Sequence, residues 1–323
     1  MQALILAGGK GTRLRPLTMH TPKPIVPIAN YPFLLYQLEL LKRAAIKDVI
    51  LSLSYQPQKI EDKLGDGTDY KVRISYTVEG PLERPALLFI NSIGTTRDLW
   101  QPQIPALVGT YRVIRYDARG HGSSTVPSGN YTIEQLGRDA LAILDAEDVK
   151  QAHICGISLG GITAMWLGVH APDRVSSLVV ANTAARIGSV QSWTDRIALV
   201  QERGMRAVAE LAMKNWFTPD FHQRRPDVVA NFKAMVESCP ATGYLGCCAA
   251  LRDEDLRDAI SSISCPVLVV AGQTDGPTPP EGLAFIHQQI KGSKMLTLDA
   301  AHLSNIEQAE AFTSALMGFL GSL

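Results

Sequence analysis

The stretch Gly156-Ile157-Ser158-Leu159-Gly160 decides how most of this chain folds. It follows an apolar run at residues 152–155 and opens an apolar, helix-compatible segment at residues 162–170. A strand, a sharp turn and a helix form the context that a G-x-S-x-G nucleophile elbow requires. The glycines leave room for neighbouring backbone, and a serine on so tight a turn projects its hydroxyl clear of the sheet. The stretch predicts Ser158 as a nucleophile, with an ordinary turn serine as the alternative.

An acid and a base follow the elbow in the chain order that such a site requires, with serine first, the acid second and histidine last. Residues 265–272 predict a buried strand, and Asp275 follows it in a turn rich in proline and glycine. Residues 294–298 predict the next strand, and His302 follows that one. We expect neutral His302 to take the proton of Ser158, and Asp275 to orient the imidazole and stabilise its charged form.

Alternatives to this acid and base are present in the sequence. Asp275 could instead cap a turn, and Asp299 is then the nearest acid. His302 is one of seven histidines, but His121 lies in a Gly-His-Gly turn and His153 lies within a predicted core strand. Neither of these two follows the acid in the chain, so His302 keeps the role of base.

An earlier strand supplies the remaining part of the predicted site. The apolar run at residues 86–90 leads into Asn91-Ser92-Ile93-Gly94-Thr95. Acyl transfer through a serine needs two N–H donors for the oxyanion, one directly behind the nucleophile and one from this loop. We therefore assign the oxyanion hole to the N–H groups of Ile93 and Leu159.

The composition excludes several kinds of partner. With 46% hydrophobic and 19% charged residues, the 323-residue chain can bury one large core or two modest ones. Its 31 Lys and Arg residues balance 31 Asp and Glu residues, so the charge favours neither nucleic acid nor an anionic membrane surface. No stretch predicts a membrane span, and Lys10, Arg13 and Arg15 interrupt any early apolar run that could form a signal peptide.

The five cysteines show no spacing typical of a metal site, and we expect neither a metal nor a cofactor. Cys155 and Cys265 fall on predicted core strands, and the adjacent pair Cys247-Cys248 favours packing over a disulfide. An odd number of cysteines without a disulfide framework indicates a reducing compartment, so we expect a cytoplasmic protein. The pattern indicates no particular oligomeric state.

From about residue 74 onward, strands alternate with helices, as a mostly parallel sheet requires. The expected strands are residues 86–90, 112–116, 151–157, 175–180, 266–271 and 295–298. Thr132 with Gln135 makes a capping box for a helix at residues 133–145. A long helical stretch at about residues 190–256, rich in Ala, Met and aromatic residues, predicts a cap over the active site.

These segments resemble the α/β-hydrolase family over about residues 75–323, and within it the bacterial 3-oxoadipate enol-lactonases. The elbow and the Gly120-His121-Gly122 turn are common to the whole family. The segments Asn182-Thr183-Ala184-Ala185-Arg186-Ile187-Gly188 and Trp216-Phe217-Thr218-Pro219 are more specific to the lactonases. The resemblance implies an α/β-hydrolase domain over residues 80–323, with a helical cap at about residues 190–256.

The resemblance also implies an activity, the hydrolysis of 3-oxoadipate enol-lactone in the β-ketoadipate pathway of aromatic-compound degradation. Ser158 would attack the carbonyl of this five-membered lactone, and water activated by His302 would then release the acyl chain. Related carboxylic-ester substrates stay open as an alternative, because contacts in the cap determine substrate choice.

A lactone that carries a free carboxymethyl group is an anion and needs a cation near the pocket. Arg186 is the first candidate, because it follows the predicted strand at residues 175–180, and Arg196 is the second. Either could instead be a surface arginine. Trp193 and Trp216 in the cap could wall the lactone ring or could be ordinary buried aromatics.

The beginning of the chain carries a separate signature. A short apolar strand at residues 3–6 runs into Ala7-Gly8-Gly9-Lys10-Gly11-Thr12-Arg13-Leu14-Arg15-Pro16-Leu17-Thr18. A glycine-rich loop after a strand, with many N–H groups and cations, can cradle a triphosphate. The segment resembles the start of sugar-1-phosphate nucleotidyltransferases. The resemblance implies a role for Lys23 in pyrophosphate chemistry and a nucleotide-binding loop of Gly8, Gly9, Gly11, Thr12 and Arg13.

This second resemblance stops near Val78-Glu79, before the part of the nucleotidyltransferases that supplies the sugar pocket and the Mg²⁺-binding aspartates. We therefore expect residues 1–79 to be a truncated, Rossmann-like α/β fragment that transfers no nucleotide. An apolar helix at residues 32–45 and a strand at residues 49–53 belong to it. Two hypotheses follow: a serine-type lactone hydrolase that carries this fragment, or a nucleotide-binding module fused to a hydrolase-like domain.

Overall fold

The computed structural model describes residues 2–7, 17, 21–28, 31–53, 57–78 and 84–323. The chain divides into two compact units, Met1–Arg84 and Pro85–Leu323, and each has its own hydrophobic core. The boundary predicted between residues 79 and 80 falls outside the described residues. Outside them, too, lie the loop residues predicted to bind nucleotide: Gly8, Gly9, Gly11, Thr12 and Arg13.

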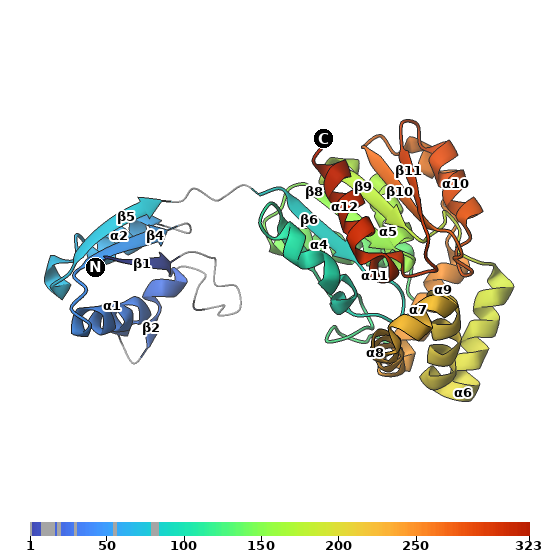
Figure 1. Ribbon diagram of the computed structural model, residues 1–323, viewed down its shortest axis with the longest axis horizontal. Coiled ribbons are helices and arrows are strands. Elements are labelled where there is room, and N and C mark those ends of the chain that lie inside the picture. Colours follow the sequence, from blue (N-terminus) through green and yellow to red (C-terminus); the bar gives the residue numbers. More distant parts are fainter. Residues whose placement is uncertain (1, 8–16, 18–20, 29–30, 54–56, 79–83) are drawn as a thin grey trace. The chain divides into compact units, whose positions relative to one another are not determined.

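A six-stranded parallel sheet forms the centre of the second unit, in the order β11-β10-β9-β8-β6-β7 (Figure 1). Its strands are β6 (Ala86–Ile90), β7 (Arg112–Arg115), β8 (Ala152–Ile157), β9 (Val175–Ala181), β10 (Val267–Gly272) and β11 (Lys294–Leu298). Every residue of β6 and of β10 is buried, as expected where helices cover both faces of a parallel sheet. The six strands predicted from the sequence are confirmed, with ends that differ by at most one residue.

Helices outside the cap pack around this sheet. They are α3 (Ile104–Leu107), α4 (Ile133–Ala146), α5 (Leu159–His170), α10 (Pro280–Gln289), α11 (Ser304–Glu307) and α12 (Ala309–Leu320). The predicted capping box is present at the start of α4, where Thr132 and Gln135 each accept a hydrogen bond from the N–H of the other. Helix α5 is buried from Leu159 to Gly168 because it packs between α4 and the strands β8 and β9.

Four helices make up the stretch predicted as a cap and lie together beside one end of the sheet (Figure 1). They are α6 (Val190–Trp216), α7 (Pro219–Arg224), α8 (Pro226–Glu237) and α9 (Ala241–Asp253). Helix α6 packs on both α8 and α9. It breaks at Gly204, whose φ of 68° lies in the left-handed region that glycine adopts without strain.

The first unit contains a three-stranded parallel sheet in the order β1-β4-β5. Its elements are β1 (Gln2–Ala7), β2 (Pro27–Ile28), β3 (Tyr31–Pro32), α1 (Phe33–Arg43), β4 (Asp48–Leu53), α2 (Pro57–Leu64) and β5 (Arg73–Val78). Leu34 and Leu38 of α1 are buried in one core with Leu51 and Leu53 of β4. The strand, helix and strand predicted for this part of the chain are therefore present, with α1 shorter than predicted.

We expect Gly160→Ala to destabilise the protein, because a Cβ on Gly160 would lie 2.1 Å from the carbonyl oxygen of Ile90. The loss in the free energy of unfolding should be about 3 kcal/mol or more, measured by urea denaturation. Gly318→Ala is the matched control, since no atom lies within 4 Å of that position in α12. It should be neutral or stabilise by about 0.5–1 kcal/mol. Equal stabilities for the two variants would contradict this account.

Candidate active site

The candidate nucleophile Ser158 lies at the turn between β8 and α5, at the carboxyl end of the central strand. Its φ of 57° and ψ of −119° are a strained conformation for a residue with a side chain. Hydrogen bonds hold this conformation: the Ser158 N–H donates to the carbonyl of Ala181 over 3.0 Å, and Thr183 Oγ1 donates to the Ser158 carbonyl over 2.8 Å. The turn therefore has the strained geometry of a nucleophile elbow.

The candidate base and acid are in contact with each other. Nδ1 of His302, after β11, lies 3.0 Å from each carboxylate oxygen of Asp275, which follows β10. Both residues are 2% exposed. The alternative acid, Asp299, is exposed, and among the described residues it forms no hydrogen bond or ion pair with His302. The geometry therefore favours Asp275 as the partner of His302.

Three further hydrogen bonds hold the Asp275 carboxylate. The N–H of Thr278 donates over 2.9 Å, its hydroxyl over 2.7 Å, and Nδ2 of Asn182 over 2.9 Å. Burial by itself raises the pKa of Asp275, but the charge of His302 and these hydrogen bonds outweigh burial. The pKa of Asp275 is therefore lowered, and the carboxylate stays ionised beside the imidazole.

The two N–H groups assigned to the oxyanion hole belong to buried residues, of which Ile93 lines the cavity that contains Ser158 and Leu159 does not. Ile93 is 5% exposed and Leu159 is 2% exposed. Within the described chain, neither N–H donates a hydrogen bond to a protein group. A buried N–H without a protein acceptor is uncommon, and one that opens on a cavity is suited to a developing negative charge.

His121 holds the loop that carries Ile93. Nε2 of His121 accepts a hydrogen bond from the N–H of Gly94 over 2.9 Å, and Nδ1 lies 3.1 Å from the carbonyl oxygen of Arg119. Nδ1 is therefore the protonated nitrogen of a neutral ring, and burial lowers the pKa of His121. The sequence predicts only a turn here, since nothing in Gly-His-Gly shows that the imidazole reaches the neighbouring loop.

One cavity of about 400 Å³ brings most of the candidate residues together. Ser158, His302 and Ile93 line it, together with Trp193, Arg196 and Trp216 of the cap. The ring of Trp216 lies 6.2 Å from that of His302, centre to centre. The cavity lies at the carboxyl ends of the strands, where α/β sheets place their ligands.

Arg186, the first candidate for the substrate carboxylate, does not line this cavity. Its Nη1 lies 3.0 Å from a carboxylate oxygen of Asp255, so its charge already has a partner. Arg196, the second candidate, lines the cavity and donates to the hydroxyl of Tyr244 over 3.2 Å. The order of preference between the two arginines therefore changes, and Arg196 becomes the residue to test.

The structure adds Asn182 and Tyr244 to the site; in the sequence, Asn182 is notable only as part of the lactonase-like segment at residues 182–188, and Tyr244 is not. Asn182 follows β9 and bonds both to Asp275 and, over 3.0 Å, to the carbonyl of Ala301. Its position directly after a predicted strand was the available signal, because such residues gather at the carboxyl edge of the sheet. Tyr244, within the cap helix α9, carried no such signal.

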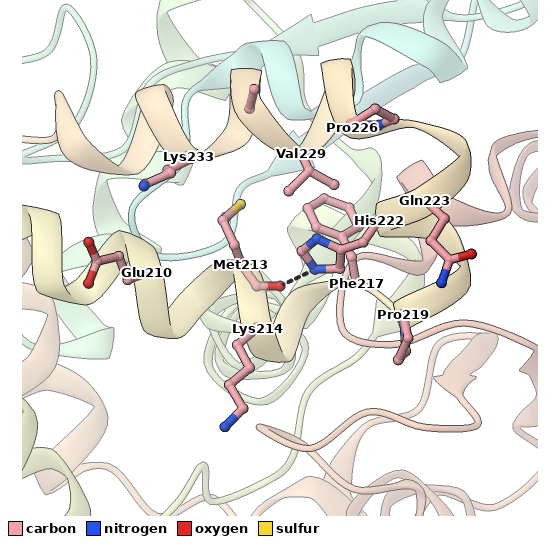
Figure 2. A pocket seen from close by; sticks show the side chains of 11 residues that line it. Glu210, Met213, Lys214, Phe217, Pro219, His222, Gln223, Pro226, Val229 and Lys233 are labelled. Carbon is pink, nitrogen blue, oxygen red and sulfur yellow. Dashed lines mark hydrogen bonds between the residues drawn. The ribbon is translucent and has the colours of Figure 1, made fainter.

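Figure 2 shows a second hollow, within the cap between α6, α7 and α8. Its volume is about 760 Å³, and Met213, Phe217 and Val229 are among the apolar residues that line it. Nε2 of His222 lies 2.9 Å from the carbonyl oxygen of Met213, so this imidazole is tied to the backbone. None of the candidate catalytic residues lines the hollow, although it is larger than the cavity at Ser158.

The sequence profile of the α/β-hydrolase fold matches residues 85–309. The chain belongs to the α/β-hydrolase family. It is 43% identical to 3-oxoadipate enol-lactonase 2 of Acinetobacter baylyi over 249 residues, which are 77% of this chain and 93% of the relative. The predicted fold and the resemblance to the enol-lactonases are thus confirmed, and the chain is a hydrolase.

Solved structures show the same fold. A hydrolase from Pseudomonas aeruginosa PA01 has a TM-score of 0.73 and 45% identity, over 75% of this chain and 92% of its own. The enol-lactonase from Burkholderia xenovorans LB400 also has a TM-score of 0.73, with 39% identity over 74% of this chain and 92% of its own. Both alignments nearly span the related protein, so the similarity extends beyond the elbow to the cap and the late strands.

The nucleotidyl transferase profile matches residues 2–103 and so overlaps the hydrolase profile at residues 85–103. Of the predicted nucleotide-binding residues, only Lys23 lies within the described part of the chain, where it is exposed.

No group of three or more His, Cys, Asp or Glu residues able to hold a metal ion is found among the described residues. Nor does any helix in the described ranges combine the length and the apolar character that crossing a bilayer requires.

The lowered pKa of Asp275 predicts how acid affects stability. Its ionised form stabilises the fold at any pH above the unfolded-state pKa of about 3.9, and this contribution is lost as the pH falls through the lower native pKa. The melting temperature of the wild type should therefore exceed that of Asp275→Asn most above about pH 5, and the gap should narrow below about pH 4. A gap that does not change with pH would contradict the prediction.

Proposed function

We propose that this hydrolase opens 3-oxoadipate enol-lactone to 3-oxoadipate with Ser158 as nucleophile. The observation that carries the proposal is the cavity that Ser158, His302 and Ile93 share, with Asp275 bonded to the far nitrogen of the imidazole. The choice of substrate is inferred from the enol-lactonases, to which the chain is similar over nearly their full length.

In the first half of the reaction, Ser158 attacks the lactone carbonyl carbon. Nε2 of His302 takes the hydroxyl proton, and Asp275 at Nδ1 stabilises the imidazolium that forms. The carbonyl oxygen becomes an oxyanion between the N–H groups of Ile93 and Leu159. The C–O bond of the ring then breaks as the His302 imidazolium gives its proton to the departing enol oxygen, which leaves His302 neutral again. The enol stays attached to the acyl chain and tautomerises to the ketone by losing its hydroxyl proton to solvent and gaining one on carbon.

In the second half, water hydrolyses the acyl-enzyme. His302 takes a proton from this water as its oxygen attacks the ester carbon, and the same two N–H groups hold the second oxyanion. His302 then returns the proton to Ser158 as the ester bond breaks. The net reaction adds one water to the lactone and restores the enzyme.

Properties of the cavity support a small lactone with a free carboxylate as substrate. The indole rings of Trp193 and Trp216 supply flat apolar walls for a five-membered ring. Arg196 supplies a cation, which an anionic substrate requires. The volume of about 400 Å³ suits a small molecule rather than a polymer.

We expect Ser158→Ala to lose nearly all hydrolysis of the enol-lactone, with kcat lower by a factor of about 10⁴–10⁶, because the nucleophile is removed. Disappearance of the ultraviolet band of the enol-lactone measures the rate. Ser238→Ala, at an exposed serine of the cap, is the control and should keep the wild-type rate. Undiminished turnover in Ser158→Ala would overturn the proposed mechanism.

The same variants separate the mechanism from the substrate. Wild-type protein that cleaves a simple aryl acetate but not the enol-lactone, with Ser158→Ala inactive on both, would retain the serine mechanism and reject the lactone. The protein would then be a carboxylic-ester hydrolase with another acyl substrate.

The match to nucleotidyl transferases favours a second candidate function, a nucleotide-binding module in the first unit. We expect no transfer activity, because the sequence leaves the nucleotidyltransferase pattern before its Mg²⁺-binding aspartates. Protein mixed with each nucleoside triphosphate, sugar 1-phosphates and Mg²⁺ should therefore release no pyrophosphate above a Lys23→Ala control. Release that depends on Lys23 would show that the fragment is an active transferase.

A further inference from the structure

Among the described residues, Arg196 has no counter-ion in the cavity at Ser158. Of the described residues that line this cavity, it is the only lysine or arginine, and no carboxylate of the described chain lies within ion-pair distance of it. Its hydrogen-bond partner is the neutral hydroxyl of Tyr244, 3.2 Å from Nη1. The guanidinium is partly buried and donates one N–H to the phenol, so its other N–H groups can bind an anion.

Tyr244 completes a pair of donors. Its side chain is buried and lines the same cavity, and burial raises its pKa, so the phenol keeps its proton. The hydroxyl oxygen accepts from Arg196, while no acceptor for its own proton lies among the described residues. A phenol whose oxygen accepts from a cation is a stronger donor, because the hydrogen bonds polarise one another.

Other polar side chains around the cavity already donate hydrogen bonds to backbone carbonyl groups. Trp193 Nε1 donates to the carbonyl of Ile187 over 2.6 Å, and the Ser192 hydroxyl donates to the carbonyl of Ser189 over 2.9 Å. Asn215 Nδ2 donates one of its two N–H groups to the carbonyl of Leu211 over 3.0 Å, and its amide carries no charge. Of the described lining, Arg196 therefore supplies the positive charge, and the neighbouring Tyr244 hydroxyl adds a free donor beside it.

Close backbone packing holds Tyr244 in place. A Cβ on Gly243 would lie 2.0 Å from the carbonyl oxygen of Gly120, so α9 meets the Gly-His-Gly turn backbone to backbone. The ring of Tyr244 also packs on the loop of the proposed oxyanion hole, 3.3 Å from where a Cβ on Gly94 would lie. A side chain held on both sides loses little entropy when it binds a ligand.

We propose that Arg196 and Tyr244 form a two-residue clamp for the free carboxylate of the substrate and so select acyl substrates that carry one. The proposal rests on the hydrolase function inferred above and names the group that its substrate must present. Tyr244 contributes the O–H donor and Arg196 the charge and a second donor. Because the clamp binds a group remote from the reacting carbonyl, it acts on specificity rather than on the chemical step.

The test compares the carboxymethyl enol-lactone with its methyl ester, which keeps the ring and loses the charge. Tyr244→Phe should lower kcat/KM for the acid about tenfold and Arg196→Gln about a hundredfold, both mainly through KM. For the methyl ester the same variants should stay within about threefold of wild type. The ratio of kcat/KM for the acid to kcat/KM for the ester should therefore fall in both variants.

Matched controls remove the same groups elsewhere. Tyr131→Phe deletes a hydroxyl bonded to the carbonyl of Pro127, and Arg252→Gln deletes an arginine of α9 that pairs with Asp253. Both should keep the wild-type preference for the acid. Equal losses on acid and ester in Tyr244→Phe and Arg196→Gln would overturn the clamp and leave the two residues a structural role.

Failure of the proposed function would look different, because wild-type protein would then turn over neither lactone. Binding of adipate to Ser158→Ala, measured by calorimetry, tests the clamp in that case. Adipate should bind at least about tenfold more weakly when Tyr244→Phe or Arg196→Gln is added, and dimethyl adipate should not distinguish the variants. Equal binding of adipate by all of them would reject the clamp.

Discussion

The close approach of the elbow backbone to β6 is the constraint on which the rest of the site depends. A Cβ on Gly160 would lie 2.1 Å from the carbonyl oxygen of Ile90, and one on Gly156 would lie 2.1 Å from the carbonyl oxygen of Gly160. Only glycine fits at these two positions. The contact brings the start of α5, which carries Ser158 and Leu159, against the chain that leaves β6 toward Ile93.

A side chain outside the predicted triad, that of Asn182, helps to position the members of the triad through hydrogen bonds. The side chain of Asn182 donates to Asp275 and to the carbonyl of Ala301, and it accepts from the hydroxyl of Ser304. It thereby joins the segments that follow β9, β10 and β11. The φ of Asn182 is 43°, a left-handed value that asparagine tolerates better than most residues. The network fixes the position of the Asp275 carboxylate, which lies 3.0 Å from Nδ1 of His302.

Elements with a strong local signal could be predicted from the sequence. Strands such as Val267–Gly272 are continuous apolar runs bounded by turn residues, and their ends differ from the prediction by one residue. The cap was predicted as helical, but not the break of α6 at Gly204, because a single glycine within a helical pattern is often tolerated. The nucleotide-like loop was recognised by its residues alone, since it lies outside the described part of the chain.

The sequence by itself determined the chain order of Ser158, Asp275 and His302, because the order of strands and turns is written along the chain. Only the tertiary structure decided which side chains share a cavity with them. The sequence alone offers both Arg186 and Arg196 as the cation for the substrate. In the structure, Arg186 pairs with Asp255, whereas Arg196 lines the cavity beside Tyr244. Such neighbours come from helix packing across distant segments, and no local pattern of residues encodes them.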